Sequence, residues 1–129
     1  MPANKLLVVD DSQTIRLSVK RLFDNAGYET IVASDGLEAI DRLSENPDLI
    51  VLDVNMPGLD GYGVCETMRE MGSRYDRLPI VFLTSVESRA MELLGHEFGA
   101  YLNKPVQPDQ LLEVVEELLA QSEPTANRE

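Results

Sequence analysis

The chain has 129 residues, which is enough for one ordinary domain whose core needs no disulfide or metal to hold it together. Its 23 acidic and 11 basic residues give a formal net charge of −12, which argues against nucleic acid or an anionic membrane as a direct partner. Because Cys65 is the only cysteine, an intrachain disulfide and a thiolate zinc cluster are excluded, and we expect a reducing cytoplasm.

Short apolar runs rich in Val, Ile and Leu predict the strands of a sheet. Runs without polar alternation are typical of parallel strands that are buried on both faces. The expected strands are Lys5 to Val9, Thr30 to Ala33, Leu49 to Leu52, Ile80 to Leu83 and Tyr101 to Asn103. The first run stops at two aspartates, so we expect neither a signal peptide nor a membrane span.

Amphipathic segments, which favour helices, separate these strands and follow the last one. The expected helices are Ile15 to Ala26, Asp35 to Leu43, Tyr62 to Met71, Glu87 to Phe98 and Pro108 to Leu119. Asp35 is expected to cap the second helix, because Glu38 lies at the spacing of a capping box. Residues 121–129 are polar and are expected to form a disordered tail.

Strands that alternate regularly with helices imply an open parallel sheet with helices on both faces. We expect a single α/β domain over residues 1–120. In such sheets, ligands bind at the carboxyl ends of the strands, beside the point where the direction of the connections reverses. Functional residues should therefore lie directly after the strands.

Polar residues do follow the strands: Asp10 and Asp11 after the first, Asp53 after the third, Thr84 after the fourth and Lys104 after the fifth. Taken singly, each has a structural explanation as a helix cap, a turn former or a solvated surface charge. Taken together, they match phosphoryl transfer to a carboxylate, in which a cation and a lysine neutralise charge. Mg²⁺ suits this set because it binds through few carboxylates plus a substrate phosphate.

Four stretches of the sequence carry a specific resemblance. They are Val8-Val9-Asp10-Asp11-Ser12, Asp53-Val54-Asn55-Met56-Pro57-Gly58-Leu59-Asp60-Gly61, Leu83-Thr84-Ser85 and Lys104-Pro105. They resemble the signature blocks of bacterial response-regulator receiver domains, the CheY-like domains of two-component systems, over about Lys5 to Ala120. The resemblance implies a flavodoxin-like (βα)5 fold, a doubly wound parallel five-stranded sheet of order 2-1-3-4-5.

The resemblance also implies a role for each matching residue. Asp53 would be the phospho-acceptor. Asp11, Asp53 and the main-chain carbonyl of Asn55 would bind Mg²⁺ directly, with Asp10 helping through a water molecule. Lys104 would pair with the phosphoryl oxygens.

Further residues would form the switch and shape the site. Thr84 would move to hydrogen-bond the phosphoryl group, and the rotamer of Tyr101 would follow it, so that new charge biases two states. Pro57 and Gly61 would shape the turn and the helix start after the third strand. The peptide bond before Pro105 is often cis in this family, which the sequence alone does not reveal.

As a function, the resemblance implies a stand-alone response regulator, a signalling domain that catalyses only its own phosphorylation and dephosphorylation. A sensor histidine kinase or a histidine phosphotransfer protein would supply the phosphoryl group. A downstream protein would bind the face of the fourth helix, fifth strand and fifth helix. The connection before Tyr101 is two residues shorter than in most members, so we expect an altered output surface.

Three alternatives stay open at this point. A receiver-like module could bind proteins without being phosphorylated. A phosphotransferase of the haloacid dehalogenase type also forms an aspartyl phosphate, but it needs a second aspartate where this chain has Asn55. A flavodoxin-like cofactor binder would hold phosphate after the first strand, where the charges of Asp10 and Asp11 would repel it.

Overall fold

The computed structural model describes residues 4–56, 58–72, 75, 78–84 and 99–122. The elements follow in the order β1 (Lys5–Val9), α1 (Gln13–Asn25), β2 (Glu29–Ala33), α2 (Gly36–Arg42), a 3-10 turn (Leu43–Glu45), β3 (Leu49–Asp53), α3 (Gly61–Met71), β4 (Ile80–Thr84), β5 (Gly99–Asn103) and α6 (Pro108–Ser122). No helix in the described part of the chain is long and apolar enough to cross a membrane.

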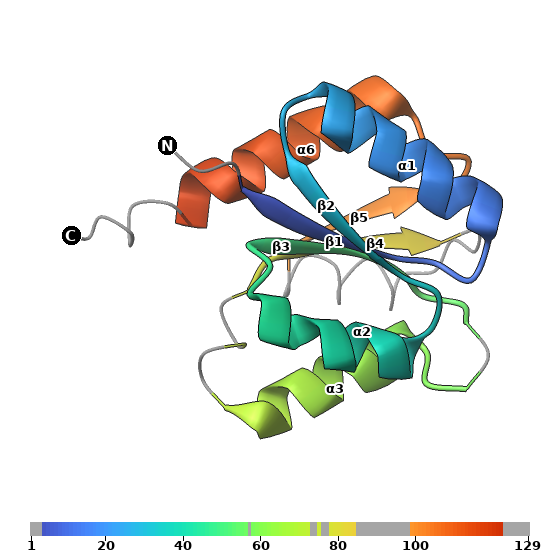
Figure 1. Ribbon diagram of the computed structural model, residues 1–129, viewed down its shortest axis with the longest axis vertical. Coiled ribbons are helices and arrows are strands. Elements are labelled where there is room, and N and C mark those ends of the chain that lie inside the picture. Colours follow the sequence, from blue (N-terminus) through green and yellow to red (C-terminus); the bar gives the residue numbers. More distant parts are fainter. Residues whose placement is uncertain (1–3, 57, 73–74, 76–77, 85–98, 123–129) are drawn as a thin grey trace.

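The five strands form one parallel sheet of order β2-β1-β3-β4-β5 (Figure 1), which confirms the expected fold. Every strand is built around Val, Ile or Leu, and all five residues of β3 and of β4 are buried. Because β1 lies between β2 and β3, the connections reverse direction there. The carboxyl ends of β1 and β3 are therefore neighbours at the edge where ligands bind in such sheets.

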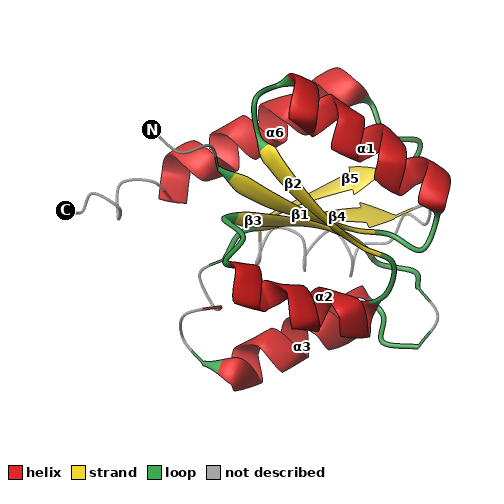
Figure 2. Cartoon of the chain, viewed as in Figure 1, coloured by secondary structure: helices red, strands yellow, loops and turns green. Residues whose placement is uncertain are grey.

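Two layers of helices cover the sheet, with α1 and α6 on one face and α2 and α3 on the other (Figures 1 and 2). Successive strand residues point to opposite faces, so each strand contributes to both layers. In β1, Leu6 and Val8 pack with Phe23 of α1 and Leu111 of α6. The alternate residues of β1 pack with the apolar side chains of α2 and α3. Apolar side chains therefore pack against both faces of the sheet.

Side-chain caps begin the helices that follow β1, β2 and β3. Ser12 Oγ accepts a hydrogen bond of 3.3 Å from the Ile15 N–H at the start of α1. Asp35 caps α2 as expected, at 2.8 Å from the Glu38 N–H. The Glu38 carboxylate reaches one residue further back than a capping box requires and accepts from Ser34. Each helix therefore begins at a defined residue close to a strand end.

Some boundaries differ from the expected ones. β5 begins at Gly99, two residues early, because its main chain pairs with β4 whether or not the side chains are large. Helix α6 extends to Ser122, two residues into the expected tail, and residues 123–129 lie outside the described residues. The helix expected over Glu87 to Phe98 also lies outside the described residues.

Candidate functional site

Three aspartates gather at the carboxyl ends of β1 and β3. Asp10 and Asp11 follow β1 directly, and Asp53 is the last residue of β3. Their carboxylate oxygens lie within 4.8 Å of one another. Asp10 is 0% exposed and Asp53 2% exposed, whereas Asp11 lies at the surface. Two buried carboxylates at such a distance require positive charge nearby.

Lys104, directly after β5, supplies part of that charge. Its Nζ lies 3.1 Å from Asp10 Oδ2 and 3.4 Å from Asp53 Oδ1. The register of β4 and β5 brings it there, because the Lys104 N–H donates a 2.8 Å bond to the Thr84 carbonyl oxygen. The peptide bond between Lys104 and Pro105 is cis. The sequence prediction that this lysine meets the aspartates is consistent with these distances.

Main-chain donors hold one oxygen of each buried carboxylate. The Ser12 N–H donates to Asp10 Oδ1 at 2.9 Å, and the Asn55 N–H donates to Asp53 Oδ1 at 3.1 Å. Asp10 Oδ2 lies 3.1 Å from Lys104 Nζ, at ion-pair distance, yet it receives no hydrogen bond from the described residues. A buried carboxylate oxygen without a hydrogen bond retains lone pairs for a second cation.

The environment of Asp53 raises the pKa of its carboxyl to about 6. Burial is the main cause, and the negative charge of Asp10 adds to it. The positive charge of Lys104 and the Asn55 N–H oppose the rise without cancelling it. One lysine is therefore too little charge for the cluster, and a hard divalent cation with oxygen ligands fits the residues present.

Thr84 and Asn55 lie together beside the cluster. Thr84, the last residue of β4, is fully buried, and its Oγ1 accepts a hydrogen bond of 3.4 Å from Asn55 Nδ2. Tyr101 lies in the middle of β5, half-buried, and its hydroxyl donates to Asn103 Oδ1 at 3.2 Å. The hydroxyl of Thr84 is thus linked to the segment after Asp53.

Gly61 begins α3 against the end of β3. A Cβ atom there would lie 3.0 Å from both the Asp53 carbonyl oxygen and the Val54 Cα, which is tighter than side chains normally pack. The Gly61 N–H also donates to the Val54 carbonyl oxygen at 3.2 Å. A side chain at this position would require the backbone of β3 to shift, so glycine suits this close approach. Pro57 lies outside the described residues, and Pro105 is exposed beside the site.

One residue at this edge was missed by the sequence analysis. Arg16 of α1 donates a hydrogen bond of 2.8 Å from Nη1 to the main-chain carbonyl oxygen of Asp10. Side chains of a helix lean toward its N-terminus, so a long residue in the second turn reaches back to the preceding strand end. An arginine six positions after a strand-end aspartate was the available signal.

Comparison with known proteins agrees with this geometry. A model of the response regulator receiver domain matches residues 6–116. Response regulator MprA of Mycobacterium avium (strain 104) is 41% identical over 128 residues, which cover 97% of this chain and 55% of that protein. The chain therefore spans about half the length of the curated relatives it matches.

Solved structures show the same fold. The chemotaxis protein CheY4 of Vibrio cholerae superposes with a TM-score of 0.82 and 35% identity, covering 90% of this chain and 98% of that one. The receiver domain of the Francisella response regulator 1452 superposes with a TM-score of 0.82 and 33% identity, covering 92% and 98%. The chain belongs to the response regulator receiver domain family of two-component systems.

Proposed function

We propose that this chain accepts a phosphoryl group on Asp53 and signals by a change in protein binding. The observation that carries the proposal is the position of the Lys104 amino group, within 3.4 Å of Asp53 and 3.1 Å of Asp10. A lysine between two buried carboxylates neutralises charge that develops on a transferring phosphoryl group. Family membership excludes the flavodoxin and haloacid dehalogenase alternatives.

The transfer is an exchange of one bond to phosphorus for another. A carboxylate oxygen of Asp53 attacks the phosphorus of a phosphohistidine, the phosphorus–nitrogen bond breaks, and the leaving imidazole nitrogen takes up a proton. With a pKa of about 6, Asp53 is mostly ionised near neutral pH and is ready to attack. The donor would be a sensor histidine kinase or a histidine phosphotransfer protein.

Mg²⁺ would be held by Asp11, Asp53 and the main-chain carbonyl of Asn55, with Asp10 helping through a water molecule. When bound, the ion would neutralise the carboxylates and the phosphoryl oxygens. Support for this assignment comes from the 4.8 Å cluster of carboxylates and from the Asp10 Oδ2 that receives no hydrogen bond from the described residues. The Ser12 N–H donates a hydrogen bond to Asp10 Oδ1, and Lys104 Nζ lies 3.1 Å from Asp10 Oδ2, so both oxygens of this carboxylate are held in position.

Phosphorylation would be read out through Thr84. Its hydroxyl oxygen accepts a hydrogen bond from the Asn55 amide in this structure, and a phosphoryl group on Asp53 would offer charged acceptor oxygens to the hydroxyl proton. Thr84 would move to donate to the phosphoryl group, and Tyr101 on the neighbouring strand would follow. The face that includes β5 and α6 would then present a changed surface to a downstream protein.

The chain would work as a signalling domain, with catalysis limited to gain and loss of its own phosphoryl group. That it acts alone, and in the cytoplasm, stays a prediction. A receiver scaffold that only binds proteins is the second candidate. The presence of Asp53, Lys104 and Thr84 at the site argues against this second candidate, because a domain that only binds proteins would not need buried charged groups.

A phosphorylation assay separates these two functions. The chain is incubated with a small-molecule phosphodonor and Mg²⁺, and the intact mass is measured. We expect one phosphoryl group on the unsubstituted chain and on Asp41→Asn, a matched control at an exposed aspartate of α2. Asp53→Asn should gain none. An adduct that persists in Asp53→Asn, or no adduct at all with Mg²⁺ present, would refute the proposal.

A further inference from the structure

Arg16 in α1 is a charged residue to which the phosphorylation chemistry assigns no role. Its Nη1 donates a 2.8 Å hydrogen bond to the Asp10 carbonyl oxygen, and the bond is partly buried. Hydrogen bonds from a guanidinium are about twice as strong as those between neutral groups. Arg16 therefore restrains the peptide group that joins Asp10 to Asp11.

The peptide group between Asp10 and Asp11 needs a restraint from another element, because the exposed side chain of Asp11 does not hold it in place. The Asp10 N–H is held by the Ala33 carbonyl oxygen at 3.2 Å, and the Asp10 carboxylate is held by the Ser12 N–H at 2.9 Å. Asp11 is exposed, so its direction depends on the orientation of the peptide before it. The bond from Arg16 fixes that orientation.

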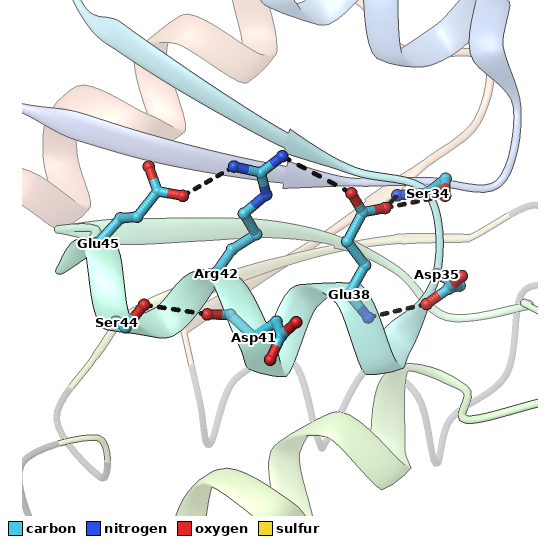
Figure 3. Close-up of polar contacts among 7 residues, drawn as sticks. All are labelled: Ser34, Asp35, Glu38, Asp41, Arg42, Ser44 and Glu45. Atoms are coloured by element: carbon cyan, nitrogen blue, oxygen red, sulfur yellow. Dashed lines mark hydrogen bonds and ion pairs between the residues drawn. The ribbon is translucent and has the colours of Figure 1, made fainter.

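The positive charge of Arg16 also acts on Glu38 of α2. Glu38 accepts two hydrogen bonds from Ser34, at 2.8 and 2.9 Å, and lies 3.7 Å from Arg42 (Figure 3). The pKa of Glu38 lies below its ordinary value, chiefly because of the bonds from Ser34, with smaller contributions from the charges of Arg42 and Arg16. The hydrogen bond to the Asp10 carbonyl oxygen is therefore the contact that defines the place of Arg16 at this edge.

We propose that Arg16 is a positioning residue of the phosphorylation site. Its bond to the Asp10 carbonyl orients the Asp10–Asp11 peptide so that the Asp11 carboxylate stays beside Asp53 around the Mg²⁺ position. The inference rests on the function proposed above, and it adds a residue that lies outside the group of carboxylates, lysine and threonine.

Two effects of removing Arg16 have opposite signs, which makes the inference testable. If Arg16 acted only through its charge, its loss would make the cluster more negative and Mg²⁺ would bind more tightly. If Arg16 orients a ligand, its loss weakens binding, and groups that orient metal ligands typically change the affinity by about 10- to 100-fold. The sign of the change identifies the cause.

The experiment is an NMR titration of the full, unphosphorylated chain with Mg²⁺. We expect Arg16→Gln to raise the Kd for Mg²⁺ about tenfold, and Arg16→Lys to raise it on the order of threefold, because lysine keeps the charge but loses the planar fork. Arg21→Gln, an exposed arginine on the same helix, is the matched control and should stay within about twofold. The carbonyl carbon resonance of Asp10 should move in Arg16→Gln without metal and stay in place in Arg21→Gln.

Three outcomes would overturn the inference. They are unchanged or tighter Mg²⁺ binding by Arg16→Gln, an equal weakening in Arg21→Gln, and an unmoved Asp10 carbonyl resonance. If Arg16→Gln does not fold, Arg16→Lys carries the same test. Failure of the unsubstituted chain to bind Mg²⁺ would remove the proposed function itself, so the two failures are distinguishable.

Discussion

Two lysine–aspartate contacts in this molecule differ in burial far more than in distance. On the surface of α1, Lys20 Nζ lies 2.7 Å from Asp24 Oδ2, and the two side chains are 39% and 43% exposed. At the sheet edge, Lys104 Nζ lies 3.1 and 3.4 Å from Asp10 and Asp53, which are 0% and 2% exposed. Breaking the shorter contact should cost less unfolding free energy, because water screens that contact and solvates both charges when they separate.

The sheet edge differs from the helix surfaces in its excess of buried negative charge. The ion pairs of Arg42 with Glu38 of α2 and with Glu45 of the following 3-10 turn are also exposed (Figure 3). At the sheet edge, by contrast, one lysine faces two buried carboxylates, and the pKa of Asp53 is raised to about 6 chiefly by burial. The excess negative charge is the feature that a cation and a phosphoryl-transfer reaction can use.

Removing the buried cation should have the largest effect. Lys104→Met leaves Asp10 and Asp53 without their positive partner, and breaking a buried ion pair typically costs about 3 kcal/mol of unfolding free energy or somewhat more. Urea unfolding at pH 7.5 without Mg²⁺ measures the loss. If the loss were below about 0.5 kcal/mol, the buried contact would behave like a surface pair.

Removing the buried acceptor charge should stabilise the metal-free protein. The ordinary pKa of an aspartate is 3.8, and the pKa of Asp53 in the folded chain is about 6, so the folded state holds the proton more tightly between those pH values. Its contribution to stability therefore falls as the pH rises from about 4 to 6.

Asp53→Asn has no such charge. Near pH 7.5 its free energy of unfolding should therefore be higher than that of the unsubstituted chain by about 1 to 2 kcal/mol, after allowance for partial solvation of the site. The advantage should shrink at pH 4.5. Urea unfolding at both pH values checks this. An advantage that is equal at the two pH values would contradict the assigned pKa.

Supplying a second cation should relieve the same excess charge. At a Mg²⁺ concentration ten times the Kd, mass action predicts a gain of about 1.4 kcal/mol in unfolding free energy. Thermal unfolding with Mg²⁺ and then with a chelator measures the gain and its reversal. The gain in unfolding free energy should be smaller in Asp53→Asn, which lacks one charged ligand. An equal gain in that variant would mean that Mg²⁺ binds at a site without Asp53.

Removing the exposed charge of Lys20 should have the smallest effect on the unfolding free energy. Lys20→Met breaks a contact that is shorter than either contact of Lys104, yet it should change the unfolding free energy by no more than about 0.5 kcal/mol. It serves as the matched control for Lys104→Met in the same urea experiment. A loss equal to that of Lys104→Met would show that distance, rather than burial, governs these contacts.

The sequence predicted the sheet because its strands are dense in Val, Ile and Leu. The same reasoning missed the start of β5, where Gly99 and Ala100 have no large apolar side chains and are held by main-chain pairing with β4. The strand ends were accurate enough to identify Asp10, Asp53 and Thr84 as neighbours, because parallel strands align their carboxyl ends.

The finer features of the site depend on directions and burial that a sequence does not contain. The hydrogen bond from Asn55 to Thr84 joins residues far apart in the chain, and the reach of Arg16 to the Asp10 carbonyl depends on one rotamer. The raised pKa of Asp53 follows from its burial and from the charge of Asp10. Residue types and spacing therefore predict which groups meet, and the structure adds how strongly they interact.

The most direct test of the central claim is chemical mapping of the phosphorylated residue. After reaction with a phosphodonor and Mg²⁺, borohydride reduces an aspartyl phosphate to homoserine, and peptide mass spectrometry locates the change. We predict homoserine at position 53 and unmodified aspartate at Asp10 and Asp11. Homoserine at either of those positions, or a phosphoryl group that resists borohydride, would contradict the assignment of Asp53 as the acceptor.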